Sequence, residues 1–470
     1  MPSISDILRQ RFPYQPTAGQ RELFGLFDQL VGKSGSALDT LLVRGYAGTG
    51  KTTIVHTLVK VLPMFNYRPV LLAPTGRAAK VLASYAGRSA YTIHKLIYRQ
   101  VADPGSGELR FERLKNYHQR CVFIVDEASM IDDEGDMSRN GLLSDLIEYV
   151  FEHGTNKLIL LGDGAQLPPV GKELSPALDS DHLSTRFGLS ILSTELREVL
   201  RQAGESAILR NATQLREQLG QGRCHPAFEI TVPGGVERLD GSGIGEALGE
   251  AYRSYGAEAT SVICRMNWQA VRYNEFIRRN ILDLHDEIEA GDILMVVRNN
   301  YFSLPEDSPA GFLANGDFVR LRRILGTEEA FGFRFARLEV ELPDYPDMGP
   351  FESWAMLDTL RSNAPSLGPE ESRRFYQQVL TRYRNLRSKK DLREALGRDE
   401  FWNALQIKFS YALTCHKAQG GQWKAVFVDQ GVKPGFEADV MHMRWLYTAI
   451  TRAEEKLYLI NFPDEYFSSV

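Results

Sequence analysis

Gly45-Tyr46-Ala47-Gly48-Thr49-Gly50-Lys51-Thr52 is the stretch that decides the fold of this chain. It satisfies the pattern Gly-x4-Gly-Lys-Ser/Thr, follows the strand-like residues 41–44 and precedes residues 54–61, which have helical spacing. Glycines let the backbone curl so that successive N–H groups and a helix N-terminus point at phosphate oxygens, while the lysine adds a positive charge. The sequence therefore predicts a strand, a phosphate-binding loop and a helix, with these residues contacting the nucleotide: Gly45, Ala47, Gly48, Thr49, Gly50, Lys51, Thr52 and Thr53.

Two carboxylates follow an apolar run that reads as a buried parallel strand. Asp126 and Glu127 come directly after residues 122–125, so they are expected at the edge of the sheet that holds the phosphate loop. Asp126 and Thr52 are predicted to bind Mg²⁺. Glu127 is predicted to orient and deprotonate the water that attacks the γ-phosphate of ATP, because hydrolysis needs a base in line with that phosphate.

A third predicted strand, residues 158–161, ends in a loop that contains Gln166. The amide of Gln166 could sense the γ-phosphate without carrying a charge. Taken alone, this loop would be interpreted only as a turn ended by proline.

The composition indicates a folded protein with several cores. A chain of 470 residues corresponds to roughly two to four domains. Its hydrophobic fraction of 43% and charged fraction of 24% leave little room for extended disorder. The net charge of -5 provides no overall basic field, which neither excludes nor supports a nucleic-acid partner, because a strand groove needs positive potential only along its own length.

Cysteine usage and the absence of membrane signals indicate a cytoplasmic protein. The four cysteines lie far apart without CxxC spacing, which argues against a zinc site and a disulfide scaffold. We see neither an export signal nor a run of 18 apolar residues, so no membrane partner is expected.

Alternating strand-like and helical segments predict an α/β fold with two parallel-sheet units. A small β-barrel-like insertion is expected from residue 310 to 343, and residues 344–366 look like a connection. The dense charge of residues 369–400 is interpreted as a solvated helical face, with a nucleic-acid contact as the alternative. The expected domains are a first unit, 1–190, with a hairpin insertion at 98–118; a second unit, 191–309 and 406–470; and an inserted barrel-like and helical domain, 310–405.

The combination and order of the motifs resemble superfamily 1 helicases of the B type, in particular the RecD-like and Dda-like group, which includes proteins similar to the α-subunit of exodeoxyribonuclease V. The similarity runs through most of the chain. Its motifs are residues 17–20, 45–53, 73–79, 91–96, 125–130, 162–169, 196–202, 414–420 and 446–453. One departure is Gln422, where many relatives carry a glutamate, which puts a ribose contact in doubt.

The resemblance implies two RecA-like domains with ATP in the cleft between them. It assigns Gln20 to adenine, Gly420 to the nucleotide, and Arg201 and Arg452 to the γ-phosphate, which they would approach as arginine fingers when the cleft closes. It also implies that the barrel-like insertion matches a Src-homology-3-like accessory module. The residues that it places on single-stranded DNA are Thr75, Arg77, Thr92, His94, Thr414, His416 and Lys417. For the two histidines a structural position is an equal alternative.

The resemblance further implies a monomeric ATP hydrolase that is stimulated by single-stranded DNA, moves 5′ to 3′ and unwinds duplex junctions, in contact with repair or replication proteins. The 98–118 hairpin is either the wedge that splits the duplex or a surface loop. An adaptor in which ATP only switches DNA affinity, an RNA helicase and a metabolic P-loop enzyme are the alternatives.

Overall fold

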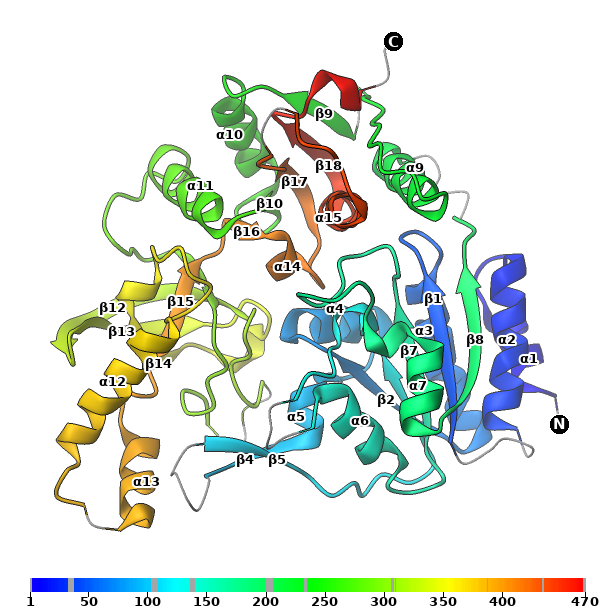
Figure 1. Ribbon diagram of the computed structural model, residues 1–470, viewed down its shortest axis with the longest axis horizontal. Helices are drawn as coiled ribbons and strands as arrows, with labels where there is room; N and C mark the ends of the chain where they lie inside the picture. Colours follow the sequence, from blue (N-terminus) through cyan, green and yellow to red (C-terminus); the bar gives the residue numbers. More distant parts are fainter. Residues whose placement is uncertain are drawn as a thin grey trace.

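The computed structural model describes residues 2–32, 38–102, 109–135, 140–199, 206–231, 235–305, 308, 310–386, 388–432 and 435–467. Two parallel sheets with helices on their faces form two lobes, and a β-barrel with a helical extension lies beside them (Figure 1). Among the helices in these ranges, none is long and apolar enough to cross a membrane.

The first lobe is built on a six-stranded parallel sheet with the strand order β3-β2-β6-β7-β1-β8. Its strands are β1 (Asp39–Gly45), β2 (Arg68–Ala73), β3 (Ala90–Thr92), β6 (Cys121–Val125), β7 (Lys157–Gly162) and β8 (Ser190–Leu196). Because the strands are parallel, the carboxyl ends of β1, β6 and β7 meet at one edge. The predicted phosphate loop, carboxylate pair and Gln166 loop follow these three ends.

Helices cover both faces of this sheet, because side chains alternate along each buried strand. In β6, Val122 and Ile124 pack in one core, while Phe123 and Val125 pack in the core on the opposite face. The first face is covered by α1 (Ile4–Arg11), α2 (Ala18–Val31), α3 (Lys51–Val61) and α4 (Gly76–Ala86). The second is covered by α5 (Ile93–Ile97), α6 (Leu142–Phe151) and α7 (Ser180–Phe187).

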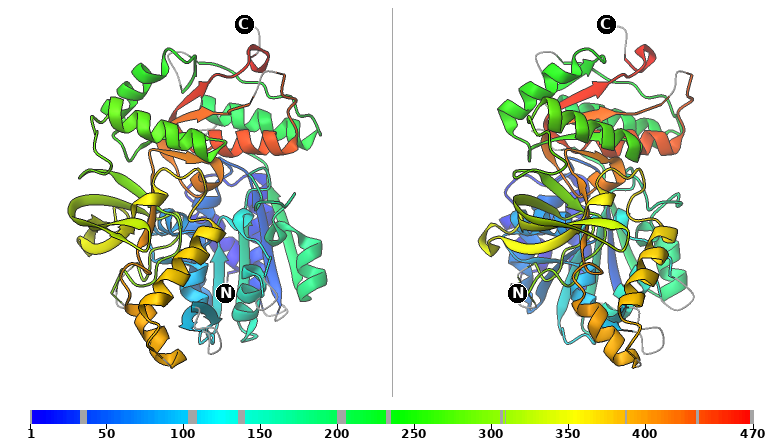
Figure 2. Two further views of the ribbon diagram at one scale, coloured as in Figure 1. Left: turned by 60° about the vertical axis from the view of Figure 1, so that its left-hand side comes forward. Right: turned by 90° about the vertical axis from the view of Figure 1, so that its left-hand side faces the viewer.

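A two-stranded antiparallel sheet projects from the first lobe. Its strands are β4 (Tyr98–Ala102) and β5 (Leu109–Arg113), and the turn between them lies outside the described residues. The hairpin expected within residues 98–118 is present in this form. It extends toward the helical insertion of the barrel (Figures 1 and 2).

The second lobe has a five-stranded parallel sheet with the order β16-β10-β17-β18-β9. Its strands are β9 (Val236–Leu239), β10 (Thr260–Cys264), β16 (Ala412–Thr414), β17 (Trp423–Asp429) and β18 (Ala453–Ile460). Its helices are α9 (Ala207–Gly220), α10 (Ile244–Tyr255), α11 (Asn267–Asn280), α14 (Cys415–Ala418) and α15 (Val440–Ile450). The two sheets confirm the expected α/β class with two RecA-like units.

The barrel is closed by β11 (Ile293–Val296), β12 (Phe318–Ala330), β13 (Phe333–Glu341), β14 (Phe351–Met356) and β15 (Leu405–Phe409). It therefore begins upstream of residue 310, because β11 pairs with both β12 and β15. The segment interpreted as a connection, residues 344–366, contains β14. Six residues of that strand pair with β13, which is a tertiary contact that local composition does not reveal.

Two helices, α12 (Pro369–Arg382) and α13 (Lys389–Arg398), carry the charged segment. Their apolar side chains, among them Phe375 and Val379, pack with Phe335 and Met356 of the barrel. Most of the described charged side chains on the two helices are exposed, in agreement with a solvated helical face. The domain boundaries predicted from sequence stay a prediction.

Candidate functional site

The phosphate loop has the backbone curl that its glycines allow. Gly48 and Gly50 have φ values of 76° and 85°, a region that disfavours side chains, and Gly50 is the N-cap of α3. The Lys51 ammonium is folded back onto the loop, where Nζ donates to the carbonyl oxygens of Gly45 and, at 2.9 Å, of Tyr46. Its charge is thus held over the loop. Thr52 is exposed in the first turn of α3, and Thr53 beside it is half-buried.

Gln20 of α2 supports the phosphate loop through a hydrogen bond to its backbone. Its side chain is fully buried, and Nε2 donates to the Thr49 carbonyl at 3.0 Å. Its Oε1 accepts the Thr17 N–H at 3.1 Å, which completes a capping box at the start of α2. The predicted adenine contact of Gln20 stays a prediction. The structure adds that this amide fixes the position of the loop.

Asp126 and Glu127 stand at the end of β6 as expected. Asp126 accepts the Tyr85 hydroxyl with one carboxylate oxygen and the Glu127 N–H at 2.9 Å with the other. Glu127 has a φ of 54°, which is uncommon for a residue with a side chain and costs about 1–3 kcal/mol. Strain of this kind persists only where the surrounding structure fixes the conformation.

Burial raises the pKa of Glu127 above its ordinary value, and the positive charge of Arg452 opposes this rise. The neighbouring Asp126 raises the pKa further, whereas Lys51 lowers it. A carboxylate with a raised pKa is a better proton acceptor than an ordinary glutamate. Arg452 belongs to the second lobe, so both lobes influence this carboxylate.

Tyr447 of α15 joins the second lobe to the phosphate loop. Its hydroxyl oxygen accepts the Ala47 N–H at 3.0 Å and donates to Asp163 at 2.6 Å. Tyr447 and Asp163 are almost fully buried. The chain of bonds therefore runs from the loop through the second lobe to the loop that follows β7.

Further hydrogen bonds cross the same seam. The Leu167 N–H donates to Thr448 at 2.8 Å, and Gln419 donates to the Leu167 carbonyl at 2.8 Å. Gln166 is buried at this seam, and its Oε1 has no hydrogen-bond partner among the described residues. Arg444 contacts the backbone carbonyl of Gln166 at 3.4 Å. The Gln166 amide therefore has an acceptor to offer at the seam.

Arg452 is buried, with 5% of its surface exposed. Its guanidinium donates to the Thr448 carbonyl at 3.1 Å, to the Gly421 carbonyl at 3.3 Å and to the Thr451 hydroxyl at 3.2 Å. These bonds hold the charge where it influences Glu127. The other predicted arginine finger, Arg201, lies outside the described residues.

All three threonines predicted to bind DNA are helix N-caps. The hydroxyls of Thr75 and Thr92 accept the N–H groups of Ala78 and Lys95 at 3.2 and 3.1 Å. Thr414 caps α14 without a side-chain bond. Capping orients each helix N-terminus, which favours negative charge nearby.

Arg77 lies between the two lobes and the barrel. Its guanidinium stacks on the rings of Trp423 and Phe318, with centroids at 3.9 and 4.7 Å, and donates to the Gln422 carbonyl at 3.3 Å. Burial lowers its pKa to about 10. In this arrangement Arg77 serves the contact between the lobes, and its DNA contact stays a prediction.

Gly420 packs against α4, because a Cβ at this position would come within 2.9 Å of the Ala78 side chain. His416 is exposed. Burial lowers the pKa of the His94 ring. Lys417 donates to Asn315, and burial lowers its pKa to about 8. The nucleotide contact of Gly420 and the DNA contacts of the other three stay predictions.

Three residues of this site were missed by the sequence reasoning: Tyr85, Asp163 and Tyr447. Asp163 and Tyr447 lie inside recognised motifs, so their position was a usable signal. Tyr85 belongs to none of the motifs. It lies near the end of α4, beyond the 73–79 motif, and only the tertiary structure brings it to Asp126.

A phosphate loop and a carboxylate pair on one RecA-like lobe, hydrogen-bonded to a second such lobe that carries a buried arginine, are the arrangement typical of two-lobed P-loop proteins. Residues 28–228 match the family model of the AAA domain, and residues 409–460 match that of the UvrD-like helicase C-terminal domain. Both models, together with the order of the motifs, support the resemblance of this chain to superfamily 1 helicases of the B type in the RecD-like and Dda-like group.

Individual relatives agree with this placement. The chain is 29% identical over 194 residues to the ATP-dependent RecD2 DNA helicase of Deinococcus radiodurans, which covers 41% of this chain and 23% of that protein. It is 25% identical over 292 residues to the ATP-dependent DNA helicase dda of Enterobacteria phage T4, with 60% of each covered. The match thus spans less than a quarter of the Deinococcus protein.

Among solved structures, one of Pif1 helicases at forked double-stranded DNA has a TM-score of 0.49 and 16% identity. The match covers 96% of this chain and 93% of that one. This likeness is too distant to add to the argument.

Proposed function

We propose that this chain is an ATP-dependent DNA helicase that couples hydrolysis to 5′–3′ movement along single-stranded DNA and to duplex unwinding. The observation that carries the proposal is the buried Tyr447 hydroxyl of the second lobe, which bonds to the phosphate loop at Ala47 and to Asp163 of the first lobe. The buried Arg452 of the second lobe also opposes the rise that burial causes in the pKa of Glu127. The polarity rests on the family resemblance.

The residues at the seam fit a nucleotide with Mg²⁺. The carboxylate of Asp126 uses one acceptor site on each oxygen and keeps others for a cation, and Thr52 has an exposed hydroxyl close to the loop. Hard oxygen donors of this kind suit Mg²⁺, which supplies charge neutralisation on the phosphates when bound. A Cβ on Gly45 would lie 3.0 Å from the Lys51 side chain, so any larger residue there would have to displace Lys51.

In the mechanism that we propose, Lys51 leaves the loop carbonyls and binds the nucleotide phosphates. Glu127 accepts the proton of the attacking water, and Gln166 uses its free acceptor to orient that water. Arg452 stabilises the charge that develops on the γ-phosphate, as Arg201 would. Because Arg452 moves with the second lobe, hydrolysis and lobe closure depend on each other.

The remaining parts of the proposal concern DNA. Motif residues 75–77, 92–94 and 414–417 would hold the strand backbone through hydroxyls, amides and cations without reading sequence. The β4–β5 hairpin would act as the wedge, and the barrel would be a Src-homology-3-like accessory module. The division into domains expected at 1–190, 191–309 with 406–470, and 310–405 is part of this proposal, with its boundaries shifted so that β8 stays in the first lobe and β11 and β15 stay in the barrel. So are the monomeric state, the cytoplasmic location and contact with repair or replication proteins.

Two assays test the proposal. Wild-type ATPase activity should rise with single-stranded DNA, and Lys51→Ala and Glu127→Gln should abolish turnover, while the exposed-site controls Lys60→Ala and Glu246→Gln retain it. Tailed duplexes test the direction, and we expect unwinding of substrates with a 5′ tail. Slow ATP turnover that single-stranded DNA does not stimulate would favour an adaptor in which ATP only switches DNA affinity. Unwinding only of duplexes with a 3′ tail would overturn the polarity.

A further inference from the structure

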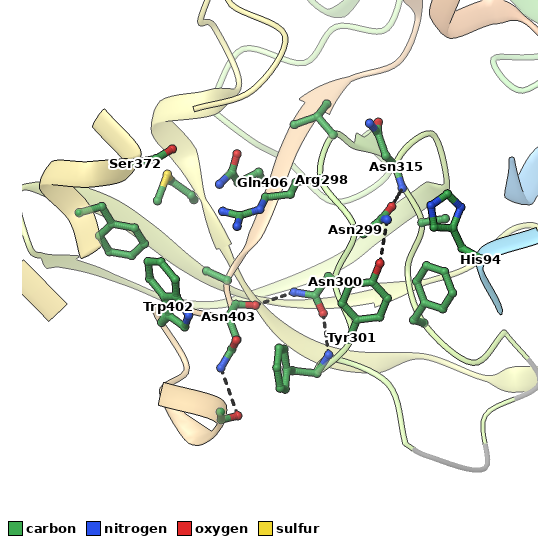
Figure 3. A pocket seen from close by; sticks show the side chains of 18 of the residues that line it. His94, Arg298, Asn299, Asn300, Tyr301, Asn315, Ser372, Trp402, Asn403 and Gln406 are labelled. Carbon is green, nitrogen blue, oxygen red and sulfur yellow. Dashed lines mark hydrogen bonds between the residues drawn. The ribbon is translucent and has the colours of Figure 1, made fainter. Parts of the chain in front are cut away.

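A large cavity lies where the first lobe, the barrel and the helical insertion meet (Figure 3). Its volume is about 880 Å³, in the range of pockets that hold nucleotide-sized ligands. Thr75, Thr92 and His94 line it from the first lobe, and the segment after β11 and the helix α12 line it from the other side. The proposed function uses the three residues on the first-lobe side for the strand backbone, and gives no role to the residues on the opposite side.

The charge of the cavity wall is one-sided. The cations Arg298 and Arg373 line it, whereas no aspartate or glutamate is found among the described residues of the wall. The chain as a whole carries 60 acidic residues and a net charge of -5, so this wall differs from the average surface. An anion is the ligand that such a wall favours.

The two arginines are not used within the protein. Neither Arg298 nor Arg373 makes an ion pair or a hydrogen bond through its guanidinium with the described part of the chain, and both are exposed. Most surface arginines of the barrel, such as Arg323 with Glu339, are paired instead. The protein atoms around Arg298 keep part of the water away from its guanidinium, and this desolvation lowers the pKa of Arg298.

Aromatic rings form two walls of the cavity. Tyr301 and Phe312 are in contact with their rings tilted, at 4.6 Å between ring centroids and 33° between planes. Opposite them, Trp402 contacts Tyr376 and Phe375 at 5.2 and 5.5 Å. Figure 3 shows the Arg298 side chain projecting into the space between Tyr301 and Trp402. Ring faces beside cations are the arrangement on which unpaired bases stack.

Amide side chains make this wall rigid. Asn300 accepts the N–H groups of Phe302 and Ser303 and donates to the Asn403 carbonyl at 2.6 Å. Gln406 accepts the Leu367 N–H at 3.1 Å, and its Nε2 has no partner among the described residues. The cavity therefore has a fixed shape and a donor available for the edge of a base.

We propose that this cavity binds one unpaired nucleotide of the single strand, with its base stacked on the aromatic walls and its phosphate held by Arg298 and Arg373. The inference rests on the proposed helicase function and adds residues outside the motifs to its strand path. The strand is favoured over a free mononucleotide because Thr75 and Thr92, already proposed for strand contact, line the same cavity.

Salt dependence of strand binding tests the phosphate contacts. Affinity of fluorescent oligothymidylate for the full chain is measured against salt for Arg298→Gln and Arg373→Gln, with Arg279→Gln and Arg374→Gln as controls outside the cavity. Each cavity variant should lower the slope of log affinity against log salt by roughly 0.7, the value for one lost phosphate contact in single strands. The controls should keep the wild-type slope.

A single abasic site moved along the oligonucleotide tests the stacking. In the wild type an abasic site at one position should weaken binding by about 5- to 140-fold, as expected for one stacked base. Tyr301→Leu should remove that position-specific loss, while the exposed Tyr14→Leu control should keep it. Circular dichroism and thermal unfolding show whether each variant is folded.

The outcomes separate this inference from the function on which it rests. If the cavity variants bind the strand with unchanged salt slopes and an unchanged abasic profile, nucleotide binding in the cavity is overturned and the proposed helicase function stands. Binding of free dTMP is measured for the same variants. If the cavity variants lose dTMP binding but keep strand binding, the cavity belongs to free nucleotides and the inference is overturned. A wild type that binds no single strand would overturn both.

Discussion

The hydroxyl of Tyr447 donates to Asp163 at 2.6 Å across the seam between the lobes. The same oxygen accepts the N–H of Ala47, a group of the phosphate loop. A nucleotide phosphate that accepts hydrogen bonds from the loop N–H groups would compete with Tyr447 for the Ala47 N–H. The position of the second lobe and the occupancy of the loop are therefore linked through one phenol.

Tyr447→Phe should destabilise the protein and weaken the link between the lobes. The variant leaves the buried Asp163 Oδ2 without its donor and the Ala47 amide without its acceptor, which costs about 1–3 kcal/mol for each unsatisfied group. Urea unfolding measures the loss. Tyr458→Phe is the matched control, because this buried tyrosine makes no hydroxyl hydrogen bond with the described residues. Equal free energies of unfolding for the two variants would contradict a stabilising role of the two Tyr447 hydroxyl bonds.

Arg452→Lys should lower the ATPase turnover number by roughly 10³- to 10⁵-fold, the range of arginine fingers. Lysine keeps the charge but cannot make the three guanidinium bonds to Thr448, Gly421 and Thr451. Steady-state kinetics at saturating ATP and DNA measure the effect, with the exposed Arg253→Lys as control. A turnover number within tenfold of wild type would remove Arg452 from the hydrolytic site.

A buried ion pair joins α11 to the start of the barrel. Arg278 binds both oxygens of Asp292 at 2.8 and 2.9 Å, and the two side chains are 3% and 0% exposed. Asp292→Asn should cost about 3–5 kcal/mol of unfolding free energy, because it leaves a buried cation without its counterion. Glu339→Gln in an exposed pair should cost at most about 1 kcal/mol. Denaturant titrations measure the unfolding free energy of both variants. Similar losses in Asp292→Asn and Glu339→Gln would refute the larger contribution of the buried pair.

Stability should fall in acid because of His442. Burial and the Arg265 guanidinium, which donates to its Nδ1, lower the pKa of His442 to about 4. The unfolded histidine, with an ordinary pKa near 6.5, binds a proton more readily, so stability is lost as the pH falls from about 6.5 toward 4. Between pH 7 and pH 5 we expect a loss of about 2 kcal/mol from this residue.

Urea unfolding at both pH values checks the His442 prediction. His442→Gln has no titrating ring and should show a smaller loss between pH 7 and pH 5 than the wild type does. His153→Gln is the control, since His153 has a backbone carbonyl partner and is part of neither lobe contact. A pH dependence that is equal in wild type and His442→Gln would contradict the assignment.

Much of the first lobe could be predicted from sequence because its signals are local. The apolar runs of β1, β6 and β7 are long enough to be buried on both faces, and each is followed by residues with a specific chemistry. The strand β14 could not be predicted in the same way. Its residues 351–356 form a strand by pairing with β13, in a region whose composition resembles a connection.

The chain's sequence by itself determined the phosphate loop, the carboxylates after β6 and the motif order, because each depends on neighbours along the backbone. Only the tertiary structure decided that Tyr447 binds Ala47, 400 positions away, and that Arg298 faces an aromatic cavity. These contacts depend on how the two sheets and the barrel pack, and packing is a sum of many weak interactions that no single segment encodes.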